Sequence, residues 1–161
     1  MRNERQRRIQ MKANESMKQE VITVNDTDLI RTVIERFIQS GISGVPVINA
    51  EQEVVGYISD GDIMRAIGKH KDIIVDTFLY VDVIKGDEED YEDRIRHILN
   101  RPVMELARRK VVTADADTEM EEIAATLGAK RIKKLPILKA GRLVGIISRG
   151  DVIRHSFKQF M

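Results

Sequence analysis

The chain has 161 residues, the length of one domain or of one compact pair of small subdomains. Its formal net charge of +1 gives no overall field that favours nucleic acid, and the lack of cysteine excludes disulfides, thiolate metal sites and a cysteine nucleophile. With three histidines we expect no histidine-rich metal centre. No apolar run approaches the ~18 residues of a membrane span, and no secretory signal follows Met1, so we expect a cytoplasmic protein away from membranes.

The chain begins with a basic segment at residues 1–12. A run such as Arg2 to Lys12 is usually a solvated tail or an exposed helix, and this is the interpretation we adopt. The alternative is a nucleic-acid contact, which would depend on salt concentration.

The apolar pattern after this tail predicts a strand at Val21 to Thr23 and then a helix. Asn25 or Asp26 can cap the helix start. Apolar residues at helical spacing run from Leu29 to Ile38, and Gly41 suits the helix end.

Two more strands and a helix complete this pattern, at Val45 to Ile48, Val54 to Ser59 and Asp62 to about Gly68. Gly56, within the second of these strands, lets another backbone or a ligand approach closely. Ser59 and Asp62 can simply cap the helix. A hydroxyl and a carboxylate at the carboxyl end of a strand can also hold a polar ligand, and their recurrence favours this second interpretation.

Residues 69–100 have no counterpart elsewhere in the chain. Ile73 to Val75 and Tyr80 to Ile84 read as apolar, extended segments. Asp87 to Asp90 forms an acidic helix start, and Tyr91 opens a stretch with helical spacing.

The first pattern then recurs about 90 residues later, with the same polar residues at its strand ends. Asp115 or Asp117 can cap the new helix, whose apolar stripe starts at Met120, and Gly128 is expected to end it. The matched pairs are Thr23 with Thr113, Pro46 with Pro136, Ser59 with Ser148, and Asp62 with Asp151.

The two halves differ in charge beside their Ser-x-x-Asp elements. Lys133 and Lys134 stand where the first half has Ser43 and Gly44. A lysine pair before a strand can be solvated surface or can contact an anion, and both interpretations remain open here.

Three motifs occur twice in the same order, where h is an apolar residue and x is any residue. They are an h-h-Thr segment, an h-Pro-h-h strand and Gly-h-h-Ser-x-x-Asp-h. This pattern resembles a tandem pair of cystathionine-β-synthase (CBS) motifs, the unit called a Bateman module. The resemblance implies an α/β fold of two β-α-β-β-α repeats packed with pseudo-two-fold symmetry. It divides the chain into the tail at 1–12, a first motif at 13–68, an insert at 69–100 and a second motif at 101–161.

The resemblance also implies ligand-binding residues in clefts that can hold adenine nucleotides. The aspartates would grip ribose, the serines ribose or phosphate, and the apolar segments would read the base. In the site of the second motif these are Val112, Thr113, Lys133, Lys134, Leu135, Pro136, Ser148, Arg149 and Asp151. In the site of the first motif they are Ile22, Thr23, Val45, Pro46, Ser59 and Asp62.

The expected function is ligand sensing without catalysis. AMP, ADP or ATP are the expected ligands, and NAD and S-adenosylmethionine also contain adenosine. A bound ligand can shift the packing of the motifs by its differential affinity for two arrangements, and the signal would pass to a partner protein. An enzyme is not expected, because His70, His97 and His155 stand in unrelated contexts. The alternative is a structural module, or one that binds protein or nucleic acid, with degenerate ligand sites.

We also expect a homodimer. The helices show wider apolar faces than one partner sheet would cover, and such faces usually mark an interface. The residues concerned are Ile30, Ile34, Phe37 and Ile38, together with Val152, Ile153, Phe157 and Phe160.

Overall fold

The computed structural model of the chain describes residues 11–86 and 88–161. Most of the basic tail, and Asp87 of the predicted acidic helix start, lie outside the described residues. The described chain forms two compact units: unit 1 comprises residues 11–23, 48–55 and 110–161, and unit 2 comprises 24–47 and 56–109. Each unit therefore combines most of one sequence repeat with the opening segment of the other repeat.

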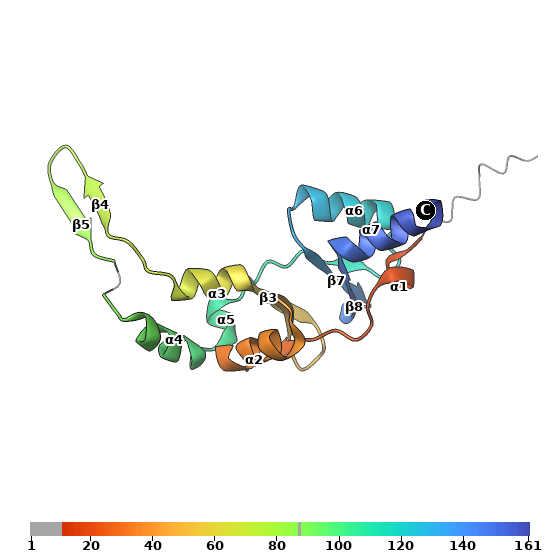
Figure 1. The fold of residues 1–161 in the computed structure, drawn as a ribbon, viewed down its shortest axis with the longest axis horizontal. Helices are drawn as coiled ribbons and strands as arrows, with labels where there is room; N and C mark the ends of the chain where they lie inside the picture. The colour runs from red at the N-terminus through yellow and green to blue at the C-terminus, as the bar shows by residue number, and fades with distance from the viewer. Residues whose placement is uncertain (1–10, 87) are drawn as a thin grey trace, which may run out of the picture. The chain divides into compact units, whose positions relative to one another are not determined.

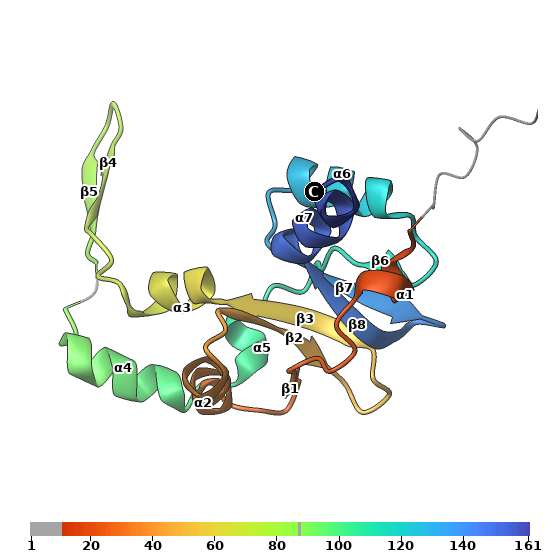
Figure 2. The ribbon, with the colours of Figure 1, turned by 45° about the vertical axis from the view of Figure 1, so that its right-hand side comes forward.

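Unit 1 is built on a three-stranded sheet in the order β6-β7-β8. Strand β6 (Ala114–Asp115) runs parallel to β7 (Lys134–Lys139), which pairs antiparallel with β8 (Arg142–Ser148). Helices α6 (Met120–Ala129) and α7 (Arg149–Phe157) lie on the same side of this sheet (Figure 2). A short 3-10 helix, η2 (Lys158–Phe160), follows α7.

The core of unit 1 includes a residue from the other end of the sequence. Ala13, in the short helix α1 (Ala13–Ser16), is fully buried with side chains from the sheet and α6. Met11 and Met17 also pack against this core. The buried cluster consists of Ala13, Ala116, Met120, Ile123, Leu127, Leu135, Ile137 and Ile147.

Unit 2 contains a second three-stranded sheet in the order β1-β2-β3. Its strands are β1 (Val24–Asn25), β2 (Gly44–Ile48) and β3 (Val54–Ser59), and its repeat helices are α2 (Ile30–Ser40) and α3 (Asp60–Ile67). The tip of the β2–β3 hairpin, residues 48–55, is counted with unit 1, where the Leu143 N–H donates to the Gln52 carbonyl at 2.9 Å. Unit 2 also holds α5 (Val103–Leu106), whose Val103 is fully buried.

The insert contributes a hairpin and a helix to unit 2. Strands β4 (Ile73–Asp76) and β5 (Val81–Ile84) pair antiparallel, which confirms the predicted extended segments. Helix α4 (Tyr91–Leu99) follows them, where helical spacing was predicted. In Figure 1 the hairpin extends away from α3 and α4.

The mixed α/β class and the repeated order of strand, helix, strand, strand, helix are confirmed. The position of the first strand of each repeat was predicted wrongly. Residues 21–23 and 111–113 have no ladder, and the short strands begin one residue after each threonine, at Val24 and Ala114. β-Branched residues favour extended backbone, but this preference alone does not provide a partner strand.

The predicted helix caps were also wrong. Asp115 accepts from the Asp117 N–H at 2.9 Å, and this turn lies before α6. The first N–H of α6, from Met120, donates instead to the Met11 carbonyl at 2.8 Å. In the first repeat the Ile30 N–H donates to the Arg101 carbonyl at 2.9 Å. Backbone from the preceding segment of the other repeat thus replaces a side-chain cap.

Two helix ends distinguish the repeats. Gly41 ends α2 with a φ of 61°, as predicted, because glycine adopts the left-handed region without strain. Gly128 lies inside α6, which continues to Ala129, so it does not end that helix. Among residues 11–86 and 88–161, no helix is long and apolar enough to cross a membrane.

Candidate functional site

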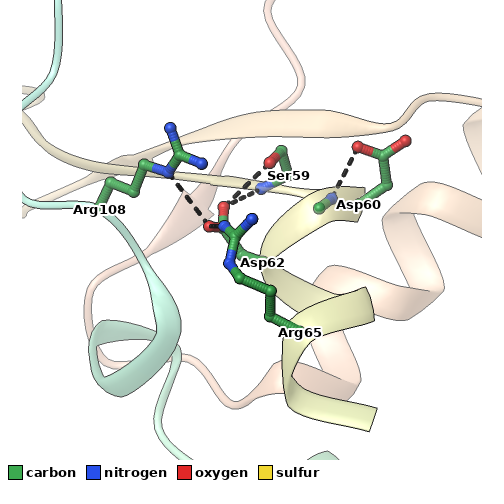
Figure 3. A network of polar contacts seen from close by, with 6 residues as sticks. Ser59, Asp60, Asp62, Arg65 and Arg108 are labelled. Carbon is green, nitrogen blue, oxygen red and sulfur yellow. Dashed lines mark hydrogen bonds and ion pairs between the residues drawn. The ribbon is translucent and has the colours of Figure 1, made fainter. Parts of the chain in front are cut away.

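The carboxylate of Asp62 lies at the junction of β3 and α3, where a strand feeds directly into a helix. Ser59 precedes α3, and both its N–H (2.9 Å) and its hydroxyl (3.0 Å) donate to Asp62 Oδ2. The other oxygen, Oδ1, accepts from Arg65 on the same helix and from Arg108 Nε at 3.2 Å (Figure 3). Asp62 is only 6% exposed, so its charged carboxylate needs partners within the protein. The capping box with Ser59 and the two guanidinium groups provide them.

Asp62 stays ionised in this setting. Burial acts to raise the pKa of its carboxyl, but the hydrogen bonds from Ser59 and the hydrogen bond and charge of Arg108 outweigh it. The net result is a pKa below the ordinary value of 3.8. The site therefore presents a fixed negative charge at the carboxyl end of β3.

Asp151 repeats this arrangement in unit 1, between β8 and α7. The Ser148 N–H and hydroxyl donate to Asp151 Oδ2 at 2.8 and 2.7 Å, and Arg154 donates to Oδ1 at 2.9 Å. Asp151 is 2% exposed. Burial acts to raise the pKa of this carboxyl, but the bonds from Ser148 and Arg154 and the charge of Lys18 lower it overall.

The opening segment of each repeat brings a basic side chain close to the aspartate of the other repeat, Arg108 to Asp62 and Lys18 to Asp151. Arg108 lies beside Tyr57 of β3, and the two exchange backbone hydrogen bonds at 2.9 Å. Lys18 exchanges bonds of 3.0 Å with Ile146 of β8 in the same way. Sequence reasoning missed both cations. The signal was available, because Lys18 and Arg108 match at the 90-residue offset that relates the repeats.

Glycines make these backbone contacts possible. A Cβ added to Gly145 would lie 2.3 Å from Met17 Sδ, and one added to Gly56 would lie 3.3 Å from the Arg108 carbonyl oxygen. The predicted close approach at Gly56 is therefore confirmed, and the approaching group is backbone.

Arg65 and Arg154 are a second pair that sequence reasoning missed. Each follows its aspartate by three residues on one helix, so the side chain reaches the carboxylate from the next turn. Their side chains are 62% and 54% exposed. The repeated signal is Ser-x-x-Asp-x-x-Arg, longer than the Ser-x-x-Asp element that we used.

The structure separates the three basic residues that were predicted for the second site. Lys134 is half-buried, and it pairs across the β7–β8 ladder with Ser148. Desolvation lowers its pKa, and so does the charge of Lys18, while Asp151 acts in the opposite direction. Lys133 is exposed, and its carbonyl accepts from the Arg149 N–H at 3.1 Å.

Arg149 is used elsewhere in unit 1. Its side chain donates to the Ile132 carbonyl at 2.7 Å and to the Leu127 carbonyl at 3.2 Å. It therefore holds the end of α6 and the turn that follows, rather than Asp151.

A tyrosine distinguishes the two sites. In unit 2 the Tyr57 hydroxyl lies over Gly44, where an added Cβ would be only 2.6 Å from Tyr57 Oη. Unit 1 has Ile146 and Lys134 at the matching positions. Burial raises the pKa of Tyr57 to about 12, with a smaller contribution from Asp60 and Asp62, so its hydroxyl is neutral. Thus a neutral phenol fills the space beside Gly44, whereas unit 1 has a lysine side chain at the position that matches Gly44.

The apolar and threonine residues of the predicted sites are divided unevenly between the units. Ile22 and Thr23 belong to unit 1, and the structure does not place them in the unit that holds Asp62. Val45 and Pro46 are fully buried in β2 and belong to unit 2 with Ser59 and Asp62. The residues predicted for the second site, Val112, Thr113, Lys133, Lys134, Leu135, Pro136, Ser148, Arg149 and Asp151, all belong to unit 1.

His97 pairs with Glu89. Within residues 11–86 and 88–161, no group of three or more His, Asp or Glu side chains could hold a metal ion.

The sequence has clear relatives. The family model for the CBS domain matches residues 13–69 and 103–158. Uncharacterized protein MJ1426 of Methanocaldococcus jannaschii is 32% identical over 145 residues, which cover 85% of this chain and 86% of that protein. The chain spans 41% of MJ1225 and 23% of inosine-5′-monophosphate dehydrogenase from the same organism, at 26% and 28% identity.

Solved structures show the same fold. The CBS-pair protein CBSX2 from Arabidopsis thaliana has a TM-score of 0.72 at 22% identity, covering 92% of this chain and 96% of that one. CBSX2 in complex with AMP gives 0.70 at 20% identity, covering 93% and 98%. The CBS domain pair of MJ0100, in complex with 5′-methylthioadenosine and S-adenosyl-L-methionine, gives 0.68 at 18% identity, covering 92% and 98%. With one match on each sequence repeat, this chain belongs to the CBS domain family and carries a tandem pair of CBS domains.

Proposed function

We propose that this CBS pair is a regulatory sensor that binds an adenosine-containing nucleotide and passes the signal to a partner protein. One observation carries the proposal: each repeat holds an ionised, almost fully buried aspartate at the carboxyl end of a strand. The complexes of CBSX2 with AMP and of MJ0100 with 5′-methylthioadenosine and S-adenosyl-L-methionine support an adenosine ligand.

The two oxygens of each aspartate have different roles in this proposal. Oδ2 is held by the serine of the capping box, which fixes the carboxylate in place. Oδ1 faces arginines that are largely exposed, Arg65 and Arg108 in unit 2 and Arg154 in unit 1. Ribose hydroxyls would replace the guanidinium groups at Oδ1. The released guanidinium groups would then be free to contact phosphate, for which their planar geometry is suited.

This exchange favours a nucleotide over its parts. A free base has no hydroxyls that could replace the arginine at the carboxylate. The buried carboxylate would then lack hydrogen bonds, which costs free energy. A nucleoside satisfies the carboxylate but leaves the arginine without an anion. A nucleotide provides both contacts, and AMP, ADP and ATP are therefore the ligands we propose first.

Isothermal calorimetry with AMP, ATP, S-adenosylmethionine, NAD and adenosine tests the proposal. Asp62→Asn and Asp151→Asn should each remove one binding event, because an amide carries no charge and accepts fewer hydrogen bonds. Asp60→Asn is the matched control, since Asp60 is exposed and its carboxylate accepts from the neighbouring Gly61 N–H at 2.8 Å. Binding of every ligand with unchanged affinity in both aspartate variants would contradict the proposal.

A second candidate is an interaction module whose ligand sites are degenerate. It is favoured by the complete satisfaction of both carboxylates within the chain itself. In that case the aspartates act as helix caps alone, and no nucleotide in the calorimetric panel would release heat.

We also propose a homodimer, for which the exposed side chains of Ile153, Phe157 and Phe160 provide an apolar surface.

A further inference from the structure

One face of the unit 1 sheet carries two lysines beside Ser148. Lys18 lies opposite Ile146 in a bridge to β8, and Lys134 lies opposite Ser148 in the β7–β8 ladder. Directly opposite residues share a face of a sheet, as do residues two apart on one strand, so both lysines share a face with Ser148. The Ser148 hydroxyl donates to Asp151, and the lysines therefore flank a ligand that this carboxylate holds.

The two lysines give this face an excess of positive charge. Desolvation lowers the pKa of half-buried Lys134 and so does the charge of Lys18, while Asp151 acts in the opposite direction. Arg154 donates to Asp151 Oδ1 at 2.9 Å, so the carboxylate interacts with an arginine as well as with the lysines. A chain of phosphates brings several negative charges, which would relieve the repulsion between the two ammonium groups.

The matching face of unit 2 has the same backbone geometry but different side chains. Arg108 lies opposite Tyr57 in a bridge to β3, in the way that the corresponding lysine of unit 1 bridges to β8. The Asp60 N–H donates to the Ser43 carbonyl at 2.8 Å, and the equivalent bond lies at the start of the β7–β8 ladder in unit 1. The two ladders thus begin in the same register, and Gly44 has the position that a lysine has on β7.

Tyr57 closes the space that a side chain at this position would need. A Cβ added to Gly44 would lie 2.6 Å from Tyr57 Oη and 3.1 Å from Tyr57 Cε1, so the tyrosine and a lysine cannot both fit. The phenol brings no positive charge, because burial and the charges of Asp60 and Asp62 raise its pKa to about 12. Asp60 is exposed close to this phenol and would repel a further phosphate.

We propose that Tyr57 determines the specificity of the unit 2 site by limiting it to ligands with no more than one phosphate, whereas the unit 1 site prefers ADP or ATP. This inference rests on the proposed nucleotide-binding function and assigns a different ligand class to each site. AMP remains a ligand of unit 2, because one phosphate can contact the arginines that ribose displaces from Asp62. Further phosphates would need cations on the face that Tyr57 and Asp60 occupy.

Single-site variants of the full-length chain separate the two ligand classes. Asp62→Asn leaves the unit 1 site, and Asp151→Asn leaves the unit 2 site. AMP, ADP and ATP are compared by isothermal calorimetry in a buffer with EDTA, so that the phosphates keep their full charge. The affinity of unit 1 should rise about three- to tenfold from AMP to ATP, whereas that of unit 2 should not rise.

An exchange of side chains tests the role of Tyr57. In the variant that keeps the unit 2 site, Gly44→Lys with Tyr57→Ile reproduces the side chains of unit 1 and should make ATP bind more tightly than AMP. Gly44→Lys alone should lower the free energy of unfolding in urea, because its Cβ meets the tyrosine ring. In unit 1, Lys134→Gln should remove the preference for ATP. Lys139→Gln, at the other end of β7, is the matched control and should keep that preference.

The outcomes separate this inference from the proposed function. Equal affinities of AMP and ATP at unit 1, or a preference for ATP at unit 2 with Tyr57 intact, would overturn the inference and leave nucleotide binding in place. An unchanged ratio of the two affinities in the Gly44→Lys and Tyr57→Ile double variant would also overturn it. The absence of binding by any nucleotide to both single-site variants would overturn the proposed function, and this inference with it.

Discussion

Arg108 Nε lies 3.2 Å from Asp62 Oδ1, although 46 residues separate the two side chains in sequence. Arg108 follows α5 and belongs to the second sequence repeat, whereas Asp62 belongs to the first. The contact exists because the Arg108 backbone pairs with Tyr57 of β3. The opening segment of one repeat thus completes the charged site of the other.

Removal of this guanidinium group should alter the acidity of Asp62. Arg108→Ala should raise the pKa of the Asp62 carboxyl, because a favourable charge and a hydrogen bond are lost while burial remains. NMR titration of the side-chain carboxyl measures this shift. Stability at pH 7 should fall by only about 0.5 kcal/mol, since the Arg108 side chain is 60% exposed. Arg109→Ala, at the neighbouring exposed position, is the control and should leave the titration unchanged.

A shortened chain should reveal the exchange of segments. Residues 1–99 lack α5 and the backbone of Arg101 and Arg108, which form hydrogen bonds with α2 and β3, respectively. We expect this fragment to unfold without cooperativity in urea, whereas residues 1–109 contain all of unit 2 and should show a cooperative transition. Equal stability of the two fragments, measured by circular dichroism, would contradict the role assigned to residues 100–109.

Two glycine substitutions should have opposite effects. Gly145→Ala places a Cβ 2.3 Å from Met17 Sδ and 2.9 Å from Met17 Cβ, so the pairing of this segment with β8 must shift. We expect a loss of about 1–3 kcal/mol in the free energy of unfolding, measured by urea denaturation. Gly128→Ala meets nothing within 4 Å and lies inside α6, so it should stabilise the chain by about 0.5–1 kcal/mol. Adding Met17→Ala to the Gly145→Ala variant should relieve part of the crowding, and the absence of any relief would refute the contact.

Stability should depend on pH through Asp151. Its pKa in the folded chain is below its ordinary value of 3.8, so its contribution is full above that value. The contribution is lost as the pH falls through the folded-state pKa, because protonation weakens the bonds from Ser148 and Arg154. Asp151→Asn should therefore flatten the acid side of the stability curve in chemical denaturation. Asp117→Asn is a control in unit 1, with a side chain 77% exposed, and should leave the curve largely unchanged.

Nucleotide affinity should differ between the two sites. Lys134 faces Ser148 across the ladder and lies in the field of Lys18 and Asp151, whereas unit 2 has Gly44 at the matching position. We expect unit 1 to bind AMP more tightly than unit 2. Arg65 and Arg108 of unit 2 can also contact phosphate, so they reduce this difference in affinity. Lys134→Ala should weaken AMP about three- to tenfold and largely spare adenosine in calorimetry. Lys139→Ala at the exposed end of β7 is the control, and an equal effect on adenosine would argue against a phosphate contact.

The sequence by itself determined the repeat and the order of elements within it. The h-Pro strands, the Ser-x-x-Asp elements and the helical stripes recur at nearly constant spacing, so they predict the same local structure twice. Ser59 with Asp62, and Ser148 with Asp151, could be paired in advance because their bonds span only one turn at a helix start. The apolar pattern of residues 73–84 likewise predicted two extended segments.

Only the tertiary structure decided which segment accompanies each repeat. Lys18 and Arg108 bond to strands that are distant in sequence, and local patterns carry no information about which strand an extended segment will join. The same contacts replaced the predicted helix caps, since the Met11 and Arg101 carbonyls satisfy the first N–H groups of α6 and α2. The direction of the Arg149 side chain, toward the end of α6, also depended on packing. Local periodicity fixed the elements, whereas long-range hydrogen bonds and buried charge fixed the composition of the sites.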